Sequence, residues 1–296
     1  MGKILFDMNN LVLRIINIGD VKTVDKTTKK VVDVDWNYWK FVVFQNIYSS
    51  LYKVKDVDTV VLAVDDKHSW RYDVYPRYKE DRKKKKLKTD DDFPWDLFFE
   101  KYQELMEEIK SHLPFKVIAV PQAEGDDIIG TIALNTQDFT EIVSNDKDFL
   151  QLCSDKVKVY NPMKQEHTEH PDPKFFLVEQ CFIGQAKDSI FNIITPSDWP
   201  ADKRKPGFGE KAFEKAVEYG WKKYIKDRGL EENFKRNLEL IDLSRTPENV
   251  KKSIMDAYNN YQYPHPEMIW QFIKKNNWPD MIESFTQLEN KLMQLY

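Results

Sequence analysis

The sequence predicts an α/β protein with a mostly parallel central sheet, followed by a region made mainly of helices. Two observations lead to this prediction. Short runs rich in β-branched residues alternate with longer segments whose apolar residues recur at helical spacing. From about residue 173 onward, only the helical patterns continue. Alternation of strands and helices is typical of a sheet with both faces covered by helices.

Five runs have the length and composition of strands: KILF (3–6), TVVLAV (59–64), KVIAV (116–120), TEIV (140–143) and KVKVY (156–160). The apolar spacing predicts helices between them over 35–54, 94–113 and 124–135. Later in the chain, a glycine-rich turn opens a helix at 207–220, and two long helices are expected around 230–260 and 266–295. We expect residues 1–184 to form the α/β core and residues 185–296 a helical region packed against it.

The composition excludes several classes of protein. The 296 residues suffice for one large domain or two moderate ones, and a net charge of −4 identifies no partner. Cys153 and Cys181 are too few for a disulfide framework and lack the companions of a zinc site. Asp7 and Arg14 interrupt the apolar N-terminal segment, so it resembles neither a signal peptide nor a membrane span. We therefore expect a soluble protein of the cytoplasm.

Acidic residues gather where the predicted strands end, which is where open α/β sheets bind ligands. They are Asp7, Asp65, Asp66, Glu124, Asp126, Asp127, Asp146, Asp148 and Asp188. Any one of them could simply cap a helix or end a strand. So many carboxylates cannot all stay ionised in one cleft without cations, because like charges raise one another's pKa. Oxygen ligands of this kind predict Mg²⁺, and two such ions would suit phosphoryl transfer.

A basic, tyrosine-rich segment follows the second predicted strand. Residues 67–88 contain ten lysines and arginines against three acidic residues. Within it, arginine and lysine are interleaved with tyrosine, a mixture suited to phosphate contacts and base stacking. The members of this mixture are Arg71, Tyr72, Tyr75, Arg77, Tyr78, Lys79 and Arg82. The lysine run 83–86, taken alone, is more typical of a solvated helix face.

A second basic segment surrounds Gly207 and Gly209, which precede an amphipathic helix. Backbone N–H groups at a helix N-terminus form a ready site for phosphate. An ordinary connection between two helices is the alternative interpretation of such a turn. The neighbouring Lys203, Arg204, Lys205 and Lys211 favour the backbone of a nucleic acid.

The order of these motifs resembles the flap endonuclease/5′-exonuclease family. The resemblance rests on Asp7, Asp65, RYDVYPRYKEDR, EGDD, SNDKDF, IGQAKDS and the glycine motif, and it runs nearly end to end. It implies a PIN-like nuclease core with a helical arch at about 67–112. It also implies that the helical region holds duplex DNA with a helix–three-turn–helix motif.

The resemblance further implies a role for each matching residue. Asp7, Asp65, Glu124, Asp126 and Asp146 would form a first metal cluster, and Asp148 and Asp188 a second, with Asp127 as a supporting neighbour. Catalysis would involve Lys79, which approaches the scissile phosphate, together with Asp126, Asp146 and Asp148. Tyr78 would stack on a base. Contacts with DNA would come from Arg71, Tyr78, Lys79, Arg82, Lys83, Gly207, Gly209 and Lys211.

Two features depart from the family pattern. Gln185 stands where the family's Gly-Asp-x-x-Asp motif has an aspartate, so we expect weaker binding of the second ion without loss of activity. An insertion, FNIITPSDWPADKRK (191–205), separates Asp188 from the glycine motif. The path of this insertion determines how the glycine motif is placed.

The resemblance implies a Mg²⁺-dependent 5′ nuclease that removes RNA primers or flaps by two-metal hydrolysis. Its substrates would be branched or nicked duplex DNA and RNA:DNA hybrids, Mn²⁺ would replace Mg²⁺, and K⁺ would bind the glycine motif. We expect a monomeric protein that acts in phage replication, in the cytoplasm of a bacterial host. A single-stranded-DNA-binding protein is a candidate partner, and no association with a membrane is expected. Two alternatives stay open: a catalytically weakened DNA-junction-binding protein of the same fold, and a PIN-type ribonuclease.

Overall fold

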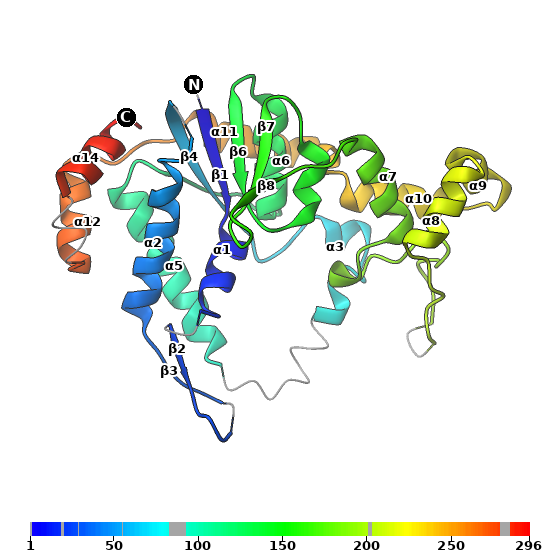
Figure 1. Cartoon of the computed structure of the whole chain (residues 1–296), viewed down its shortest axis with the longest axis horizontal. Coiled ribbons are helices and arrows are strands. Elements are labelled where there is room, and N and C mark those ends of the chain that lie inside the picture. The colour runs from blue at the N-terminus through cyan, green and yellow to red at the C-terminus, as the bar shows by residue number, and fades with distance from the viewer. Residues whose placement is uncertain are drawn as a thin grey trace.

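The computed structural model describes residues 2–18, 21–28, 30–54, 56–82, 93–200, 203–278 and 285–296. Its centre is a six-stranded sheet in the order β5-β4-β1-β6-β7-β8 (Figure 1). The first five strands in this order run parallel, and β8 pairs antiparallel with β7. The strands are β1 (Gly2–Asp7), β4 (Val57–Val64), β5 (Lys116–Ala119), β6 (Phe139–Val143), β7 (Val157–Asn161) and β8 (Glu166–Thr168). The predicted mostly parallel α/β core is confirmed.

The central strand β1 is buried on both faces, as its apolar sequence requires. Leu5 lies in register with Val61 on β4 and Ile142 on β6, and all three side chains are fully buried against one group of helices. Ile4 and Phe6 point to the opposite face, into a second apolar cluster. The sheet therefore separates two cores, one on each side.

Helices cover each face of the sheet (Figure 1). One face packs against α1 (Met8–Ile15), α2 (Trp36–Ser50), α5 (Trp95–His112), α12 (Met268–Asn276) and α14 (Phe285–Met293). The other packs against α6 (Gly125–Asn135), the 3₁₀ helix η1 (Lys147–Leu152) and α11 (Glu248–Asn259). Helices from the end of the chain thus complete both cores.

The remaining helices, α7 (Pro173–Ile183), α8 (Glu210–Glu218), α9 (Trp221–Asp227) and α10 (Glu231–Ile241), form the right-hand side of Figure 1. Phe182 lies at the centre of their own apolar cluster, with its ring near those of Phe208, Phe213 and Phe234. Among the described residues, no helix combines the length and apolar character that crossing a membrane requires.

Two sequence expectations need correction. The helix expected over 230–260 is divided into α10, the 3₁₀ helix η3 (Leu243–Arg245) and α11, because Asp242 caps the short turn and Pro247 precedes α11. The helix expected over 266–295 is also divided, since α12 ends at Asn277 in a left-handed conformation and α14 begins at Phe285. The hairpin of β2 (Lys22–Val24) and β3 (Val31–Val34) and the short helix α3 (Arg71–Val74) were not predicted.

Candidate active site

The predicted acidic residues meet at the carboxyl ends of the parallel strands. Asp7 is the last residue of β1, Asp65 follows β4, and Asp146 lies shortly after β6. Glu124 and Asp126 lie at the start of α6, which follows β5. A pocket of about 180 Å³ is lined by these five acids and by Asn9, Asn10, Leu13, Tyr78, Lys79, Arg82, Lys187 and Asp188. A neighbouring pocket of about 380 Å³ shares Asp146 and Lys187 and also contains Asp148 and Gln185.

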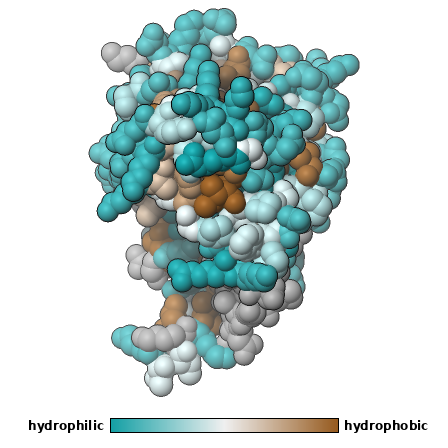
Figure 2. Space-filling view, turned by 90° about the vertical axis from the view of Figure 1, so that its right-hand side faces the viewer, coloured by the Kyte–Doolittle hydropathy of each residue, from teal (hydrophilic) through white to brown (hydrophobic). Residues whose placement is uncertain are grey.

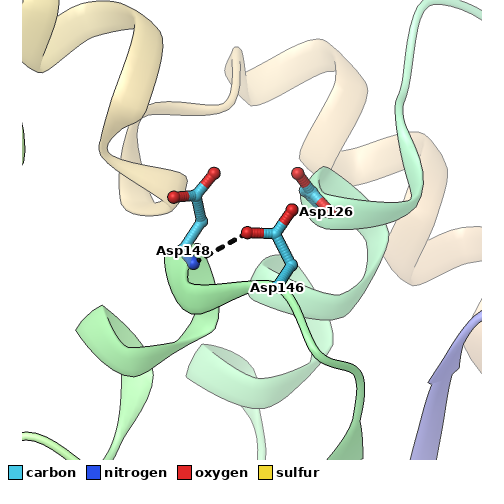
Figure 3. A group of neighbouring side chains, drawn as sticks. All are labelled: Asp126, Asp146 and Asp148. Carbon is cyan, nitrogen blue, oxygen red and sulfur yellow. Dashed lines mark hydrogen bonds between the residues drawn. The ribbon is translucent and has the colours of Figure 1, made fainter. Parts of the chain in front are cut away.

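Three of these carboxylates lie especially close together. Asp126, Asp146 and Asp148 each contribute one oxygen to a group within 4.8 Å of one another (Figure 3). The backbone N–H of Asp148 donates to Oδ1 of Asp146 at 3.0 Å, which fixes the turn between the two residues. Asp126 reaches the same space from the first turn of α6. Residues distant in the sequence thus point into one space.

Burial and crowding keep several of these carboxyl groups from ionising easily. Burial, with Asp65 and Asp146 adding, raises the pKa of Asp7 to about 7, although Asn10 N–H and Ser144 Oγ donate to it. Burial and then Asp146 raise the pKa of Asp148 to about 6. Burial also lifts the pKa of Asp126 well above its usual range, and neighbouring Asp7 adds to this effect. If all of these carboxyl groups ionise, the site carries more negative charge than its own side chains neutralise.

Basic side chains neutralise only part of the cluster. Lys79 pairs with Glu124, Lys187 with Asp146 and Asp148, and Arg82 Nη2 lies 3.1 Å from Asp188 Oδ1. Among the described residues, no lysine or arginine forms an ion pair with Asp7, Asp65 or Asp126. Their oxygen atoms and unneutralised charge fit a hard divalent cation, for which carboxylates are the preferred ligands.

Asp127 and Arg71 lie behind the site rather than in it. Asp127 is fully buried, and its two oxygens accept from Trp70 Nε1, Thr246 Oγ1, Arg71 Nη1 and the N–H of Glu124. Arg71 is 3% exposed and also donates to Glu124 Oε2 and to the carbonyl of Leu240. Its guanidinium faces protein, so the structure does not support the expected contact between Arg71 and DNA. Both residues instead hold Glu124 in place.

Tyr78, Lys79 and Arg82, to which the resemblance assigns contacts with DNA, line the pocket. Tyr78 is 5% exposed, and its hydroxyl donates to Glu124 Oε2 at 2.7 Å; burial raises the pKa of this hydroxyl, which keeps it a donor. Lys79 adopts a left-handed backbone conformation (φ 56°), and its N–H donates to the carbonyl of Asp188 at 2.8 Å. Strained backbone of this kind is often found at functional sites. Stacking of a base on Tyr78 stays a prediction.

The structure also places residues 191–200 and 203–205 of the insertion before the glycine motif. Arg236 donates to the carbonyls of Phe191 and Thr195, each at 3.0 Å, and Arg77 donates to the carbonyl of Trp199 at 2.6 Å. The insertion is thereby fixed to α10 on one side and to the basic segment on the other. Gly207, Gly209 and the exposed Lys211 follow it at the start of α8. Lys83 lies outside the described residues.

The sequence interpretation missed Lys187, and also Asn9, Asn10 and Leu13, which line the pocket as well. The ammonium group of Lys187 contacts both Asp146 and Asp148. The only sequence signal was its place directly before Asp188 in a motif with one carboxylate missing. Gln185, which replaces that carboxylate, donates from Nε2 to Asp148 Oδ1 at 2.7 Å.

Comparisons with known proteins agree with this architecture. The family model of the 5′-3′ exonuclease N-terminal resolvase-like domain matches residues 5–179, and that of the T4 RNase H C-terminal domain matches residues 172–288. Ribonuclease H of Enterobacteria phage T4 is 26% identical over 230 residues, which cover 73% of this chain and 74% of that protein. A thermostable DNA polymerase I of Thermus caldophilus is 28% identical over 198 residues, which are 63% of this chain but only 19% of the polymerase.

Among solved structures, the chain resembles a flap endonuclease of bacteriophage T5 in complex with DNA and metal ions. The TM-score is 0.61 at 18% identity, and the match covers 94% of this chain and 98% of the T5 protein, which supports the shared fold. The first family model alone spans more than half of the sequence. The chain therefore belongs to the 5′-3′ exonuclease family.

Proposed function

We propose that this protein is a Mg²⁺-dependent, structure-specific 5′ nuclease that hydrolyses phosphodiester bonds at flaps and RNA primers. The observation that carries the proposal is the meeting of Asp7, Asp65, Glu124, Asp126 and Asp146 in one pocket, next to Lys79 and Arg82. Acidic ligands for a cation and basic groups for a phosphate are what phosphodiester hydrolysis requires. Membership of the 5′-3′ exonuclease family supports the same reaction class.

Asp7, Asp65, Asp126 and Asp146 are the residues that would hold Mg²⁺. When bound, Mg²⁺ would activate water and stabilise negative charge on the phosphate. Asn10 N–H and Ser144 Oγ orient Asp7, and the N–H of Gly125 orients Asp65 at 2.7 Å. Such supporting hydrogen bonds keep ligand oxygens in position for a metal.

Lys79 is the basic residue best placed to act on the phosphate. Its side chain is 17% exposed, lines the pocket and pairs with Glu124. The neighbouring acids Glu124 and Asp188 raise its pKa despite burial, so the ammonium stays charged. A fixed positive charge at the reacting phosphate stabilises the charge that develops there. Tyr78 and Arg71 hold Glu124 and so position Lys79 indirectly.

The glycine motif is the proposed grip on the DNA backbone. A Cβ added at Gly207 or Gly209 would meet no atom within 4 Å, and neither glycine has a positive φ. Packing within the chain therefore does not require glycine here, whereas close approach of a ligand would. Lys203, Arg204, Lys205 and Lys211 are exposed around it, and hydrophilic side chains cover most of this side of the molecule (Figure 2). Binding of K⁺ to this motif stays a prediction.

The substrates follow from the relatives by similarity. The T5 flap endonuclease was solved with DNA and metal ions, and the T4 relative is a ribonuclease H. We propose that this chain likewise acts on branched or nicked duplex DNA and on RNA:DNA hybrids, in replication and as a monomer. A single-stranded-DNA-binding protein is the corresponding candidate partner.

The test is cleavage of a 5′-labelled flap duplex, with product lengths resolved on a denaturing gel. The protein is incubated with Mg²⁺, with Mn²⁺ and with a chelator, and the same flap strand without its duplex serves as the control. We expect short 5′ fragments that end near the junction, with either metal and only on the duplex. A parallel substrate with an RNA flap measures the preference for RNA. Cleavage that continues in the chelator would contradict the proposal.

One observation favours a second candidate function, that of a DNA-junction-binding protein with weakened catalysis. Gln185 and Lys187 both occupy oxygens of Asp148, a predicted ligand of the second metal. Tight binding of the flap duplex without cutting, in Mg²⁺ and in Mn²⁺, would identify such a protein. Cutting of the single-stranded RNA flap without its duplex would instead point to a ribonuclease.

A further inference from the structure

A side-chain cation already lies where the two predicted metal clusters meet, between Asp146 of the first and Asp148 of the second. Lys187 Nζ lies 2.8 Å from Asp146 Oδ1, 2.6 Å from Asp146 Oδ2 and 2.9 Å from Asp148 Oδ2. One ammonium group thus bridges two carboxylates from the turn after β6. These oxygens belong to the group of three acids that is close enough to hold a metal ion.

Other polar side chains also occupy carboxylate oxygens that a second metal ion would need. Gln185 Nε2 donates to the remaining oxygen of Asp148 at 2.7 Å, and the amide is buried. Arg82 Nη2 lies 3.1 Å from Asp188 Oδ1. Asp146, Asp148 and Asp188 therefore face two side-chain cations and one amide donor. A dication entering here would have to displace at least one of them.

The other half of the site differs in charge. Asp7, Asp65 and Asp126 form no ion pair with any lysine or arginine of the described residues, and Glu124 has Lys79 as its ion-pair partner on the pocket side. An unpaired group of carboxylates is stabilised by a cation from solution. The two halves therefore differ, because a metal ion would stabilise the unpaired carboxylates of Asp7, Asp65 and Asp126 more than those that already face side-chain cations.

The backbone fixes Lys187 in this position. It lies in the 3₁₀ turn η2 (Ala186–Asp188), whose ends are joined by paired hydrogen bonds between Gln185 and Ile190. Gly184 precedes the turn with φ 74°, and a Cβ there would lie 2.6 Å from the carbonyl oxygen of Ile190. The carbonyl of Lys187 also accepts from Arg82 Nε at 3.0 Å. The lysine is therefore presented to the carboxylates by a turn with little freedom.

We propose that the ammonium group of Lys187 takes the place of the second divalent cation, so that the protein without DNA binds one such ion tightly, at Asp7, Asp65 and Asp126. Asp146, the fourth ligand of the proposed function, stays paired with Lys187 in this state. This inference rests on the proposed function. A lysine ammonium is a compact point charge with three donors, which suits it to bridging two carboxylates. It brings one positive charge where a metal ion would bring two. From the sequence, only Gln185 indicates a weakened second site.

The test counts bound ions in the absence of DNA. Mn²⁺ is titrated into the metal-free protein by calorimetry, and electron paramagnetic resonance detects pairs of neighbouring Mn²⁺ ions by their spin coupling. We expect one tightly bound Mn²⁺ and no coupled pair in the natural protein. Lys187→Met should bind a second Mn²⁺ at least about tenfold more tightly than the natural protein does, because a competing charge is gone. Addition of Gln185→Asp to Lys187→Met should tighten this second site again.

Two controls separate the role of Lys187 from general charge and folding effects. Lys147→Met removes an exposed lysine from the turn between Asp146 and Asp148, so it makes the same change of net charge. It should leave one bound Mn²⁺. Lys187→Arg keeps the positive charge and should also bind one. Circular dichroism checks that each variant is folded.

Two equally tight Mn²⁺ ions in the natural protein, unchanged by Lys187→Met, would overturn the inference. That result would leave the proposed function intact, because an active nuclease with two ions would still cut the flap duplex. A protein that binds one Mn²⁺ but does not cut the flap duplex would contradict the proposed function and leave the inference about Lys187 intact. Ion counting therefore tests the inference about Lys187, and cleavage tests the proposed function, separately.

Discussion

Single residues at this site combine structural and chemical roles. Asp7 caps α1 by accepting from Asn10 N–H, and it also lines the acidic pocket. Asp146 caps η1 through Asp148 N–H, and its carboxylate also pairs with Lys187. Capping explains why aspartate is favoured at these positions in any protein. The sequence pattern alone therefore could not distinguish a cap from a ligand, and only the meeting of several acids in space does.

The buried position of Arg71 predicts a large effect on stability. Arg71→Met would leave Asp127 and Glu124 without their buried partner, so we expect the free energy of unfolding to fall by about 3–5 kcal/mol. Urea unfolding followed by circular dichroism measures this. The exposed Arg204→Met serves as the matched control and should change stability by less than about 0.5 kcal/mol. Equal stability of the two variants would mean that Arg71 is not a structural anchor.

The crowded carboxylates predict a pH-dependent effect of Mg²⁺. Burial raises the pKa of Asp7 from its ordinary 3.8 to about 7, so between these values the folded protein binds more protons than the unfolded chain. Its contribution to the free energy of unfolding therefore falls as the pH rises through this range. Mg²⁺ binds the ionised form and should restore stability, by about 2.7 kcal/mol at a hundredfold excess over Kd.

Thermal unfolding at pH 5 and pH 8, each with Mg²⁺ and with a chelator, measures this effect. We expect Mg²⁺ to raise Tm clearly more at pH 8 than at pH 5. Asp7→Asn should reduce the difference between the two pH values. An equal rise in Tm at both would be evidence against a metal site built from these acids.

At the scale of elements, the parallel strands were predictable from the sequence, but the hairpin 22–34 and the breaks between the C-terminal helices were not. The β-branched runs predict all five parallel strands, and the acids that follow them predict the site. The hairpin 22–34 was missed because its charged sequence, KTVDKTTKKVVDV, lacks an apolar alternation. The breaks near Asp242 and Asn277 depend on local backbone conformation rather than on apolar spacing. Lys187 was missed because its contacts with Asp146 and Asp148 form only when η2 packs against the turn after β6.

The open surroundings of the glycine motif predict a separation of binding from stability. Gly207→Ala places a methyl group in open space, so the free energy of unfolding should change by less than about 0.5 kcal/mol. We expect the same methyl group to weaken binding of the flap duplex about tenfold, or about 1.4 kcal/mol, by blocking approach of the DNA backbone. Fluorescence anisotropy in a chelator measures the affinity without cleavage.

Gly184→Ala provides the contrast to Gly207→Ala. Its Cβ would collide with the carbonyl of Ile190, so this variant should lose more than about 1 kcal/mol of stability. Unchanged DNA affinity of Gly207→Ala would remove the glycine motif from the proposed DNA surface.

At the scale of the whole molecule, the helical end of the chain completes the cores on both faces of the sheet. Leu243, Val250 and Ile254 belong to the apolar cluster on one face. Phe272, Ile273 and Leu288 belong to the cluster on the other. The boundary expected at residue 184 therefore divides the sequence patterns but not the packing. Sequence patterns show which segments are helical, whereas which core they join depends on the tertiary fold.

This shared packing predicts a single cooperative unfolding transition. Scanning calorimetry of the full chain should give equal calorimetric and van't Hoff enthalpies. A chain that ends at residue 184 should expose both apolar faces and bind the dye ANS. Two well-separated transitions in the full chain would show instead that residues 1–184 and 185–296 fold independently.

The central claim is that the acids at the strand ends form the active site of a 5′ nuclease. Single-turnover cleavage of the flap duplex by Asp126→Asn tests it most directly, with Asp155→Asn as control, because Asp155 is exposed at the opposite end of the sheet. We predict that Asp126→Asn binds the duplex normally but cuts it at least about a hundredfold more slowly, a loss of about 2.7 kcal/mol. Asp155→Asn should behave like the natural protein. Cleavage by Asp126→Asn at the natural rate would contradict the account.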